Sequence, residues 1–297
     1  MRYLLVFNPQ AGNGRAAKSL NTLLTALGQH DLALDTYLTT DPGAAIRHLA
    51  ELDLDQYSGV IAAGGDGTLY EVINGYYRNP STSIRPPVGV LPMGTGNAFI
   101  RDMNLAQSGW ESALEVILAG NTREVDVGRF TTEGGTFHFM NILGLGFVAD
   151  VGAVAQRLKF LGNLSYTLGV LYRTIFLAPH EIEITVNGEV LERENLFVEI
   201  SNTRYTSNFL MAPAAEVDDG LLDVTLLASI SRRKLITSFP KILTGEHVEL
   251  PEVETFQASR IEVRTNVPKI LTPDGELMGS TPLRVECLKQ AVRVFWP

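Results

Sequence analysis

Two periodicities of hydrophobic and polar positions alternate through roughly the first 125 residues. Short apolar runs such as Tyr3–Phe7 and Gly59–Ala63 predict buried strands, whereas the leucines of Leu20–Leu27 recur at helical spacing. Further strands are predicted over Leu32–Leu38 and Val88–Leu91, and further helices over Ile46–Leu52, from Leu69 onward and over Glu111–Leu118. Strand–helix units that repeat with short connections favour a parallel sheet covered by helices on both faces.

Beyond residue 125 the dominant period falls to two residues. The alternation over Glu181–Val186 runs into Asn187-Gly188, which is the strongest short signal for a hairpin. Other strand-like runs are Thr136–Phe139, Leu196–Ile200, Leu221–Leu227, Ile261–Arg264 and Leu283–Leu288, interrupted by helical stretches near 149–172 and 231–243. We therefore predict an α/β domain over residues 1–125 and a mainly antiparallel β domain over residues 126–289. The last strand, within residues 290–297, is expected to return to the first domain.

Composition removes several classes of function. The chain has 24 lysines and arginines against 33 aspartates and glutamates, a net charge of −9, which disfavours general nucleic-acid binding. A single cysteine, Cys287, excludes an internal disulfide, and the scattered histidines form no cluster with zinc spacing. No apolar stretch reaches the roughly 20 residues that a membrane-spanning helix needs. These features predict a cytoplasmic protein without a transmembrane segment.

Three glycine-rich loops each follow a predicted strand. They are Asn8–Gly14, Gly64–Thr68 and Pro92–Asn97. Ligands of open α/β sheets bind at this carboxyl edge, where glycines admit a phosphate and helix starts offer free N–H groups. A tight turn explains one such loop equally well, but three together favour a phosphate site. Neither a Walker loop nor a Rossmann fingerprint is present.

The second loop carries a carboxylate, Asp66, that would repel phosphate unless a cation intervened. This residue therefore suggests a nucleotide bound with Mg²⁺. In the same segment Thr68 and Glu71 have the spacing of a capping box, which predicts that the following helix begins there.

Five motifs in order resemble the diacylglycerol kinase catalytic family, whose bacterial lipid kinases are related to sphingosine and ceramide kinases. They are Asn8–Gly12, Gly64–Thr68, Pro92–Asn97, Asp219–Asp223 and Asp274–Glu276. A more distant resemblance links the chain to the NAD kinase and phosphofructokinase superfamily. The resemblance implies a nucleotide-binding α/β domain followed by a β-sandwich domain, with the active site in the cleft between them. It also implies transfer of the γ-phosphoryl group of ATP to the hydroxyl of a diacylglycerol-like or sphingoid-like lipid.

The same resemblance implies roles for individual residues. The nucleotide contacts would be Asn8, Thr39 (or its neighbour Thr40), Gly65, Asp66, Gly67, Thr68, Glu71, Gly94 and Thr95. A structural Mg²⁺ would bind the Asp219 carboxylate and the carbonyl groups of Glu216 and Leu221. Asp274 would be the general base, assisted by Glu276, although Asp274-Gly275 taken alone is more simply a hairpin turn.

Two departures from the family pattern leave the acceptor open. Tyr70 stands where the family usually has Asn. Ala98 stands where bacterial diacylglycerol kinases often have Asp, and an Ala at this place is more like the sphingosine and ceramide kinases. For Asp126 the resemblance implies pairing with a basic residue, Arg15 or Arg101. A solvated carboxylate at a strand end is an equal alternative.

The segment Ser231–Lys241 places Arg232, Arg233, Lys234 and Lys241 beside Leu235, Ile236 and Phe239. Such a segment fits an anionic membrane surface, which would make the protein peripheral to the membrane, or it packs its apolar side on its own domain. The predicted helix over Leu164–Phe176 likewise lines an acyl-chain cleft or belongs to the core. Two rival functions stay open: a kinase of a soluble acceptor, of the NAD kinase type, and a non-catalytic nucleotide-binding regulator. The sequence does not decide the lipid or the oligomeric state.

Overall fold

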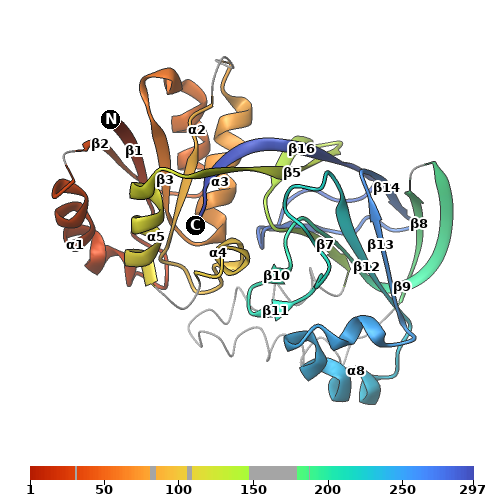
Figure 1. Cartoon of the computed structure of the whole chain (residues 1–297). Helices are drawn as coiled ribbons and strands as arrows, with labels where there is room; N and C mark the ends of the chain where they lie inside the picture. Colours follow the sequence, from red (N-terminus) through yellow and green to blue (C-terminus); the bar gives the residue numbers. More distant parts are fainter. Residues whose placement is uncertain (31, 81–84, 106–108, 147–178, 187) are drawn as a thin grey trace. The chain divides into compact units, whose positions relative to one another are not determined.

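The computed structural model describes residues 1–30, 32–80, 85–105, 109–146, 179–186 and 188–297 (Figure 1). The helices predicted over 149–172 and Leu164–Phe176 lie outside these residues. The chain divides into two compact units, the first formed by Met1–Val125 with Gln290–Pro297 and the second by Asp126–Lys289. Each unit has its own sheet pairing and its own buried side chains.

The first unit is built on parallel strands. They are β1 (Arg2–Phe7), β2 (Ala33–Leu38), β3 (Gly59–Gly64) and β4 (Val88–Pro92), in the order β4-β3-β1-β2. The end of β16 (Leu283–Phe295) joins β4 in parallel, with Val294 opposite Val88. All residues of β3 are buried, as expected for a strand covered on both faces.

Helices cover both faces of this sheet. They are α1 (Ala16–Gly28), α2 (Ala44–Glu51), α3 (Asp66–Arg78), the short α4 (Ala98–Asp102) and α5 (Gly109–Ala119), with a 3₁₀ turn over Leu54–Gln56. In Figure 1 α1 and α5 lie on one side of the strands and α2 and α3 on the other. The connection from β1 to β2 runs toward one edge of the sheet, and the connections from β2 to β3 and from β3 to β4 run toward the other edge. Because such connections are right-handed, the helix of the first lies on one face and the helices of the other two lie on the opposite face.

The capping-box prediction for α3 is wrong. The helix begins at Asp66, with Gly65 at its N-cap, so Thr68 lies inside the first turn and donates its N–H to the Gly65 carbonyl at 2.9 Å. The Glu71 carboxylate does not return to its own helix start, because it binds the start of α2 instead. A tertiary partner therefore replaces the local one.

The second unit is mainly antiparallel. Its strands are β5 (Thr122–Thr132, which begins in the first unit), β6 (Gly135–Phe139), β7 (Ile142–Gly146), β8 (His180–Val186), β9 (Glu189–Ser201), β10 (Tyr205–Thr206), β11 (Phe209–Leu210), β12 (Leu222–Ala228), β13 (Val253–Ala258), β14 (Arg260–Thr265), β15 (Leu271–Pro273) and most of β16. The predicted hairpin is confirmed by the β8–β9 pairing, in which Val186 lies opposite Glu189.

The two strands predicted near the C-terminus are one strand in the structure. Leu283–Leu288 and most of the last strand predicted within residues 290–297 fall within β16, which ends at Phe295 and continues through Lys289-Gln290 although these polar residues interrupt the hydrophobic alternation. The main chain makes the ladder hydrogen bonds, so a strand can continue where its side-chain pattern does not.

Alternating side chains of the second unit meet in one apolar core. Its members include Ile182, Ile184, Val198, Ile200, Leu222, Val224, Leu226, Ile261, Val263, Leu283 and Val285, two residues apart on each strand. This is the period-two pattern expected of a sandwich whose strands bury one face.

A smaller apolar cluster joins the outer side of β9 to the segment that follows β12. Phe197 packs there with Leu227, Ile230 and Leu235. The helix predicted over 231–243 is α-helical only over α8 (Arg232–Ser238), and 3₁₀ turns follow over Phe239–Leu243 and Glu246–Glu249. Pro240 explains the change, because proline has no N–H to continue an α-helix.

Candidate functional site

The three glycine-rich loops of the first unit pack backbone against backbone. A Cβ atom added to Gly94 would lie 2.5 Å from Gly65 Cα, and one added to Gly12 would lie 2.7 Å from the Met93 carbonyl oxygen. The Gly64 carbonyl accepts the N–H groups of Met93 at 2.8 Å and Gly94 at 3.1 Å. Only glycine permits these approaches, so the loops behave as one surface at the carboxyl ends of β1, β3 and β4.

Asn8 connects the first loop to the second. Its Nδ2 donates to Thr68 Oγ1 at 3.3 Å, and its Oδ1 accepts the N–H of Gln10 at 2.9 Å. Its own N–H donates to the Ala63 carbonyl at 2.9 Å, at the end of β3. Because Thr68 is buried, these contacts hold the predicted nucleotide contacts Asn8 and Thr68 together.

Asp66 has a use that its position in the sequence did not show. Its Oδ1 accepts the N–H of Ala98 at 2.8 Å, at the start of α4. Burial raises the pKa of Asp66, while backbone N–H groups of Ala98, Phe99 and Asn97 act in the opposite direction. The negative charge of Asp66 is therefore stabilised by the N-terminus of α4. A bound cation is no longer needed to explain a carboxylate among the phosphate-type loops.

The third loop presents its tip to solvent. Thr95 is exposed, and Asn97 fixes the loop because its Oδ1 accepts the Gly94 N–H at 3.1 Å while its Nδ2 donates to the Gly94 carbonyl at 3.0 Å. Gly67, in the first turn of α3, is partly exposed. These two predicted contacts are accessible to a ligand.

The predicted contact Glu71 is occupied by the protein itself. Its two carboxylate oxygens accept the N–H groups of Gly43 at 2.7 Å and Ala45 at 3.0 Å, at the start of α2. Thr39, at the end of β2, donates its N–H to the Phe7 carbonyl at 2.9 Å, beside the first loop. The neighbouring Thr40 is exposed and donates to Asp41 at 2.7 Å.

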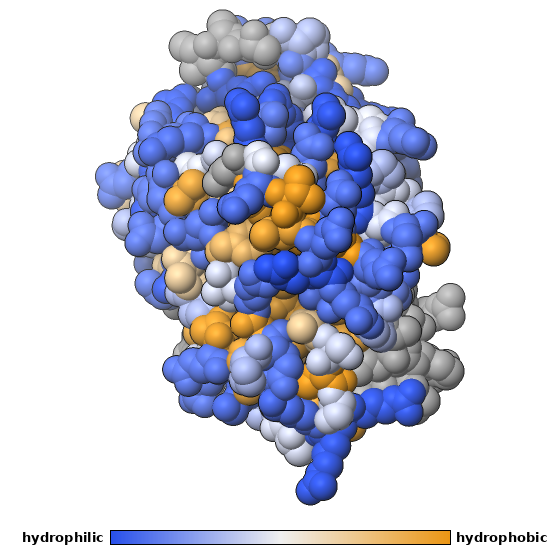
Figure 2. Space-filling view, turned by 90° about the vertical axis from the view of Figure 1, so that its right-hand side faces the viewer, coloured by the Kyte–Doolittle hydropathy of each residue, from blue (hydrophilic) through white to orange (hydrophobic). Residues whose placement is uncertain are grey.

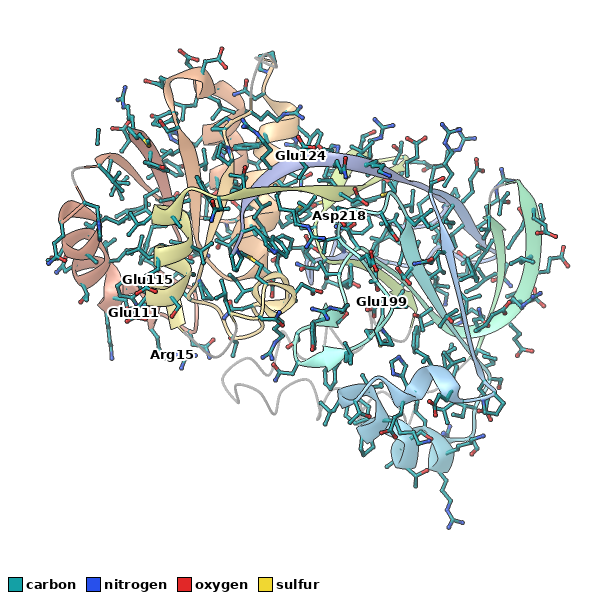
Figure 3. All side chains as sticks on the ribbon, in the orientation of Figure 1. Arg15, Glu111, Glu115, Glu124, Glu199 and Asp218 are labelled. Carbon is teal, nitrogen blue, oxygen red and sulfur yellow. The ribbon has the colours of Figure 1, made fainter. Side chains whose placement is uncertain are left out.

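Closely approaching glycines beside the start of α3, whose dipole favours an anion, suit a polyphosphate. Arg15 adds positive charge, because its Nε donates to the Gly12 carbonyl at 2.8 Å and its guanidinium therefore stays beside the first loop (Figure 3). This surface can neutralise and orient an anionic ligand.

In the second unit Asp274 is buried and holds a turn of the backbone. Its Oδ2 accepts the N–H of Met140 at 2.9 Å, and its Oδ1 accepts those of Asn141 at 2.8 Å and Ile142 at 3.0 Å. Three such donors stabilise the ionised carboxylate and fix both of its oxygens. The sequence contained no sign of these partners, which lie more than 130 positions away.

The Asp-Gly dipeptide also forms the hairpin turn that the sequence allowed. Asp274 has φ of 46° and Gly275 has φ of 87°, and the Glu276 N–H donates to the Pro273 carbonyl at 2.8 Å. Positive φ at both central positions is the geometry of a tight hairpin turn. Within this turn the Glu276 residue is exposed, whereas Asp274 is buried.

Asp126 is not the solvated strand-end carboxylate that one reading of the sequence gave. It is fully buried, and its Oδ2 accepts the N–H of Gly220 at 2.6 Å. Asn202, which the sequence reasoning missed, donates from Nδ2 to the carbonyls of Asp126 and Met140, both at 2.9 Å. These bonds connect the Asp219-Gly220 loop to the turn that Asp274 holds.

The predicted structural metal site lies on that loop. Asp219 Oδ1 accepts the Leu221 N–H at 2.8 Å, and Glu216 is exposed. Burial raises the pKa of the nearby Asp223 to about 6, and the charges of Asp219 and Glu216 add to this rise. The local potential is thus negative and the donors are oxygens, as a hard cation requires. Among the described residues, no group of three or more His, Cys, Asp or Glu side chains is arranged to hold a metal ion.

Sequence reasoning also missed Glu199, an acid within the apolar run Leu196–Ile200. It is fully buried on β9 (Figure 3), Thr206 Oγ1 donates to its Oε1, and its Oε2 has no hydrogen-bond partner within the described part of the chain. Burial raises the pKa of Glu199 to about 7. The available signal was a charged residue that interrupts a run of consecutive apolar residues.

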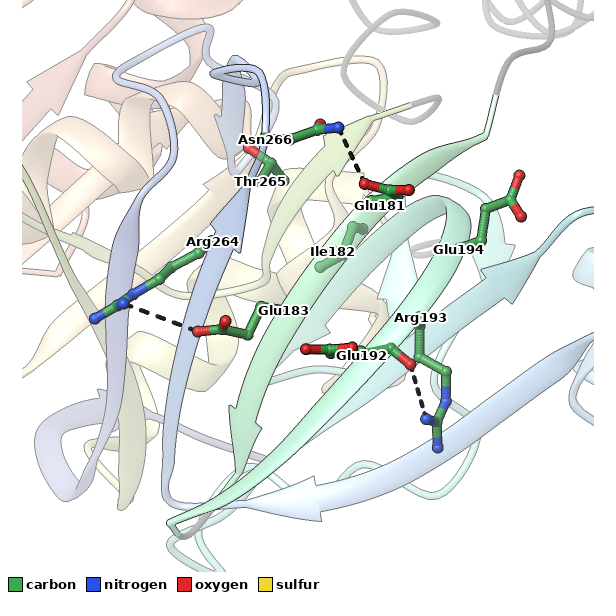
Figure 4. Close-up of a pocket in the computed structure, with 9 residues that line it drawn as sticks. All are labelled: Glu181, Ile182, Glu183, Glu192, Arg193, Glu194, Arg264, Thr265 and Asn266. Carbon is green, nitrogen blue, oxygen red and sulfur yellow. Dashed lines mark hydrogen bonds and ion pairs between the residues drawn. The ribbon is translucent and has the colours of Figure 1, made fainter.

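A surface depression between β8, β9 and β14 is lined by charged side chains (Figure 4). Arg264 pairs with Glu183 at 3.9 Å and Arg193 with Glu254 at 3.1 Å. These groups are exposed and satisfy one another, so the depression lacks the convergent buried polar groups of a ligand site.

Comparisons with known proteins give the same picture along the whole chain. Residues 2–130 match the family model of the diacylglycerol kinase catalytic domain, and residues 141–296 match that of the YegS C-terminal NAD kinase beta sandwich-like domain. A diacylglycerol kinase of Staphylococcus saprophyticus is 30% identical over 299 residues, covering 100% of this chain and 95% of the relative. The chain belongs to the diacylglycerol kinase family. The predicted family is thereby confirmed.

Two further diacylglycerol kinases resemble the chain in sequence or in fold, and an NAD kinase shares the fold. The Bacillus subtilis diacylglycerol kinase is 29% identical, covering 100% of this chain and 96% of the relative. A crystal structure of a putative diacylglycerol kinase from Bacillus anthracis has a TM-score of 0.81 at 27% identity, covering 100% and 97% of the two chains. An Archaeoglobus fulgidus NAD kinase in complex with ATP shares the fold, with a TM-score of 0.55 at 12% identity, covering 99% of this chain and 93% of that one.

Membership of a kinase family makes the chain an ATP-dependent phosphotransferase. The predicted architecture, a parallel α/β sheet followed by an antiparallel β-sandwich, is confirmed by the structure and by its neighbours.

Proposed function

We propose that the chain is a Mg²⁺-dependent lipid kinase that transfers the γ-phosphoryl group of ATP to a lipid hydroxyl. The acceptor is diacylglycerol-like or sphingoid-like, residues 1–125 with 290–297 hold the nucleotide, and residues 126–289 hold the lipid. The observation that carries the proposal is the packing of three glycine-rich loops into one backbone surface at the ends of β1, β3 and β4. Relatives whose printed name is diacylglycerol kinase support the choice of a lipid acceptor.

The proposed nucleotide residues divide into two kinds. Gly65, Gly67, Gly94 and Thr95 would meet the phosphates directly, because glycine admits close approach and the tip at Thr95 is exposed. The others, Asn8, Thr39, Asp66, Thr68 and Glu71, would act mainly by holding the loops and the starts of α2 and α4 in place. Positioning of this kind supplies much of the catalysis in phosphoryl transfer.

Asp274 is proposed as the general base. A carboxylate held ionised by three N–H donors is a weak base, but proton transfer to it becomes favourable as the attacking hydroxyl acidifies in the transition state. The hairpin turn makes its position rigid, which lowers the entropy lost on aligning the hydroxyl. Glu276, at the exposed side of the same turn, is proposed to assist.

For the metal we propose the Asp219 carboxylate with the carbonyl groups of Glu216 and Leu221 as ligands. Their oxygens and the negative potential around Asp223 fit Mg²⁺. When bound, Mg²⁺ supplies positive charge that offsets the carboxylates of this loop. The loop itself is fixed by Asp126 through the Gly220 N–H.

The lipid is proposed to be reached at a membrane surface by way of α8 and the 3₁₀ turn after it. Among the described residues, no helix combines the length and the apolar character needed to cross a bilayer. Leu235 packs inward, whereas Ile236 and Leu243 are 45% and 55% exposed in the segment that also carries the exposed Arg232 and Arg233. At the lower end of the face in Figure 2, where α8 lies, hydrophobic side chains stand between hydrophilic ones. Exchanging both arginines for glutamate should lower cosedimentation with anionic vesicles but leave phosphorylation of short-chain acceptors unchanged.

The deciding experiment is transfer of labelled γ-phosphate from ATP to lipids in mixed micelles. The panel holds diacylglycerol, monoacylglycerol, phosphatidylglycerol, sphingosine and ceramide, with NAD as the soluble acceptor. Label on a lipid, lost in Asp274→Asn and on removal of divalent cations by chelation, supports the proposal.

The rival functions give different results in the same assay. Label on NAD alone would replace the lipid acceptor by a soluble one. Binding of ATP with no label on any acceptor would favour a regulator without catalysis, and Tyr70→Asn would then test whether this departure from the family pattern is responsible.

A further inference from the structure

The face of β9 opposite the sandwich core carries Phe197, which belongs to the smaller apolar cluster, followed by two polar side chains, Glu199 and Ser201. Val198 and Ile200 belong to the core, and side chains of a strand alternate between faces. Glu199 and Ser201 therefore share the opposite face, and both are fully buried. Buried polar groups normally have hydrogen-bond partners, so two buried polar side chains on this face require an explanation.

The register of the sheet brings this face to Asp274. Ser201 lies opposite Ile142, and the carbonyl of Ile142 accepts the N–H of Asp274 at 2.9 Å. Glu199 lies opposite Gly144, two residues further along the same strand pair. With strands about 4.8 Å apart and about 6.8 Å per two residues, the Cα atoms of Asp274 and Glu199 are separated by about 12 Å. A short polar headgroup and two side chains span that separation.

Several buried polar atoms near Asp274 have no hydrogen-bond partner within the described part of the chain. They are Glu199 Oε2, Ser201 Oγ, Asn202 Oδ1 and Asn141 Nδ2. Asn141 and Ile142 are also the residues whose N–H groups bind the Asp274 carboxylate. These four atoms come from residues that the strand register places around the proposed base, while further unsatisfied atoms, such as Asn195 Nδ2 and His247 Nδ1, lie elsewhere in the described part of the chain.

The carboxylate of Glu199 determines which chemical groups of a ligand could bind to these unsatisfied atoms. An ionised carboxylate accepts hydrogen bonds and donates none, so it favours a hydroxyl or an ammonium and disfavours an ester carbonyl. Thr206 supplies one donor to Oε1, and burial raises the pKa of Glu199 to about 7, as expected when the charged form lacks a further partner.

We propose that Glu199, with Ser201 beside it, is an acceptor-binding subsite that takes a hydrogen-bond donor carried next to the phosphorylated hydroxyl. The donor is an ammonium, as in a sphingoid base, or a second hydroxyl, as in a monoacylglycerol. This inference rests on the proposed function and narrows its acceptor, because diacylglycerol carries neither group beside its single hydroxyl. Glu199 is a binding residue here and has no part in proton transfer.

The test compares three acceptors in wild type and in Glu199→Gln, which keeps the shape and removes the charge. We expect the KM for sphingosine and monoacylglycerol to rise at least about tenfold in Glu199→Gln, a loss typical of a charged hydrogen bond. The KM for diacylglycerol and for ATP should change less than about twofold on the same grounds. Glu192→Gln, an exposed glutamate of the same strand, is the matched control and should match wild type.

A second measurement does not depend on turnover. At pH 6 the carboxylic-acid band of Glu199, identified as the infrared difference between wild type and Glu199→Gln, should disappear when hexadecylamine is added in micelles. Methyl palmitate, which has an ester and no donor, should leave the band unchanged. An ammonium bound to Oε2 favours the ionised form, which explains the expected loss.

The outcomes separate this inference from the proposed function. If wild type labels no lipid, the proposed function fails, and the infrared measurement still decides whether Glu199 meets an ammonium. The inference is overturned if Glu199→Gln changes all three acceptors by the same factor, or if hexadecylamine and methyl palmitate act alike on the band. Lower thermal stability with unchanged KM values would assign Glu199 a structural role only and would also overturn it.

Discussion

The candidate sites of the two units are built from different material. In the first unit the surface is backbone: glycines in close contact across the loops, beside the start of α3. In the second unit it is buried carboxylates: Asp274 and Asp126 bind main-chain N–H groups far away in the sequence, and Glu199 binds the hydroxyl of the nearby Thr206. A backbone surface accepts any polyphosphate of suitable shape, whereas placed carboxylates select particular hydrogen-bond donors.

This difference explains why one site could be read from sequence and the other only in part. A glycine-rich loop directly after a strand is a contiguous signal, and parallel strands bring such loops to the same edge. A buried carboxylate gains its meaning from partners that the strand register supplies. Four substitutions test this comparison.

The largest effect is expected for Asp274→Asn. Loss of a general base should lower kcat by about 10²–10⁴-fold, with little change in the KM for ATP. The measurement is turnover on whichever lipid wild type labels, together with the thermal midpoint, because the carboxylate also holds the 140–142 turn.

Thr272→Val is the control for that structural part. Thr272 lies on β15, two residues before Asp274, and its Oγ1 donates to the carbonyl of Gly144 on β7 at 3.1 Å. The variant therefore loses a buried hydrogen bond but keeps the Asp274 carboxylate. It should lower the thermal midpoint and keep kcat within a few-fold of wild type. Equal losses of kcat in both variants would refute the catalytic assignment of Asp274.

Glu199 should make stability depend on pH. Its folded-state pKa of about 7 lies above its ordinary value of 4.5, so the folded protein binds more protons in that window and stability falls as pH rises. The expected fall is on the order of 3 kcal/mol between pH 4.5 and 8, of which roughly 1 kcal/mol lies between pH 6 and 8.

Chemical denaturation at pH 6, 7 and 8 measures this slope. Asp223, with a pKa raised to about 6, acts mostly below that range. Glu199→Gln should lose most of the slope and be more stable than wild type at pH 8, whereas Glu192→Gln should keep it. An unchanged slope in Glu199→Gln would show that the buried acid does not titrate there.

Gly94→Ala tests the backbone surface. Its Cβ would lie 2.5 Å from Gly65 Cα, so the two loops must separate, at an expected loss of about 1–3 kcal/mol and of measurable ATP affinity. Gly28→Ala is the control, since Gly28 ends α1 with no atom within 4 Å of an added Cβ. Unchanged ATP binding in Gly94→Ala would mean that this loop contact does not shape the nucleotide site.

The smallest effect is expected for Glu71→Gln. The amide keeps one acceptor for Gly43 or Ala45 but loses the charge at the start of α2, worth about 1 kcal/mol. Glu115→Gln, an exposed position on α5, should be neutral in the same denaturation measurement. A loss of ATP affinity without a loss of stability would instead place Glu71 in direct contact with the nucleotide.

Much of the fold followed from hydrophobic period alone. The predicted strands over Tyr3–Phe7, Gly59–Ala63 and Glu181–Val186 match β1, β3 and β8. The missed strands include β7, whose Ile142–Gly146 contains two glycines, and β15, which has three residues. Such segments are strands because neighbouring strands offer hydrogen-bond partners, and no local pattern records that.

The candidate site likewise divides into features that the local sequence predicted and features that depend on distant partners. Asp274 was predicted both as a turn and as a base, and its turn geometry was found, but its three N–H partners were not foreseen. Glu71 was predicted to cap its own helix and binds another one, because the start of α2 offered two free N–H groups nearby. Local preference lost to a stronger tertiary contact.

By itself the sequence determined the α/β and β-sandwich architecture, the three phosphate-type loops and the kinase family. Each depends on neighbours in the chain: the period of a strand or helix, or a loop joined to the strand before it. Only the tertiary structure showed that Asp66 serves α4, that Asp126 is buried on Gly220, and that Glu199 shares a sheet face with Ser201. Burial and register decide these facts, because an acid's charge and partners depend on residues that only folding brings to it.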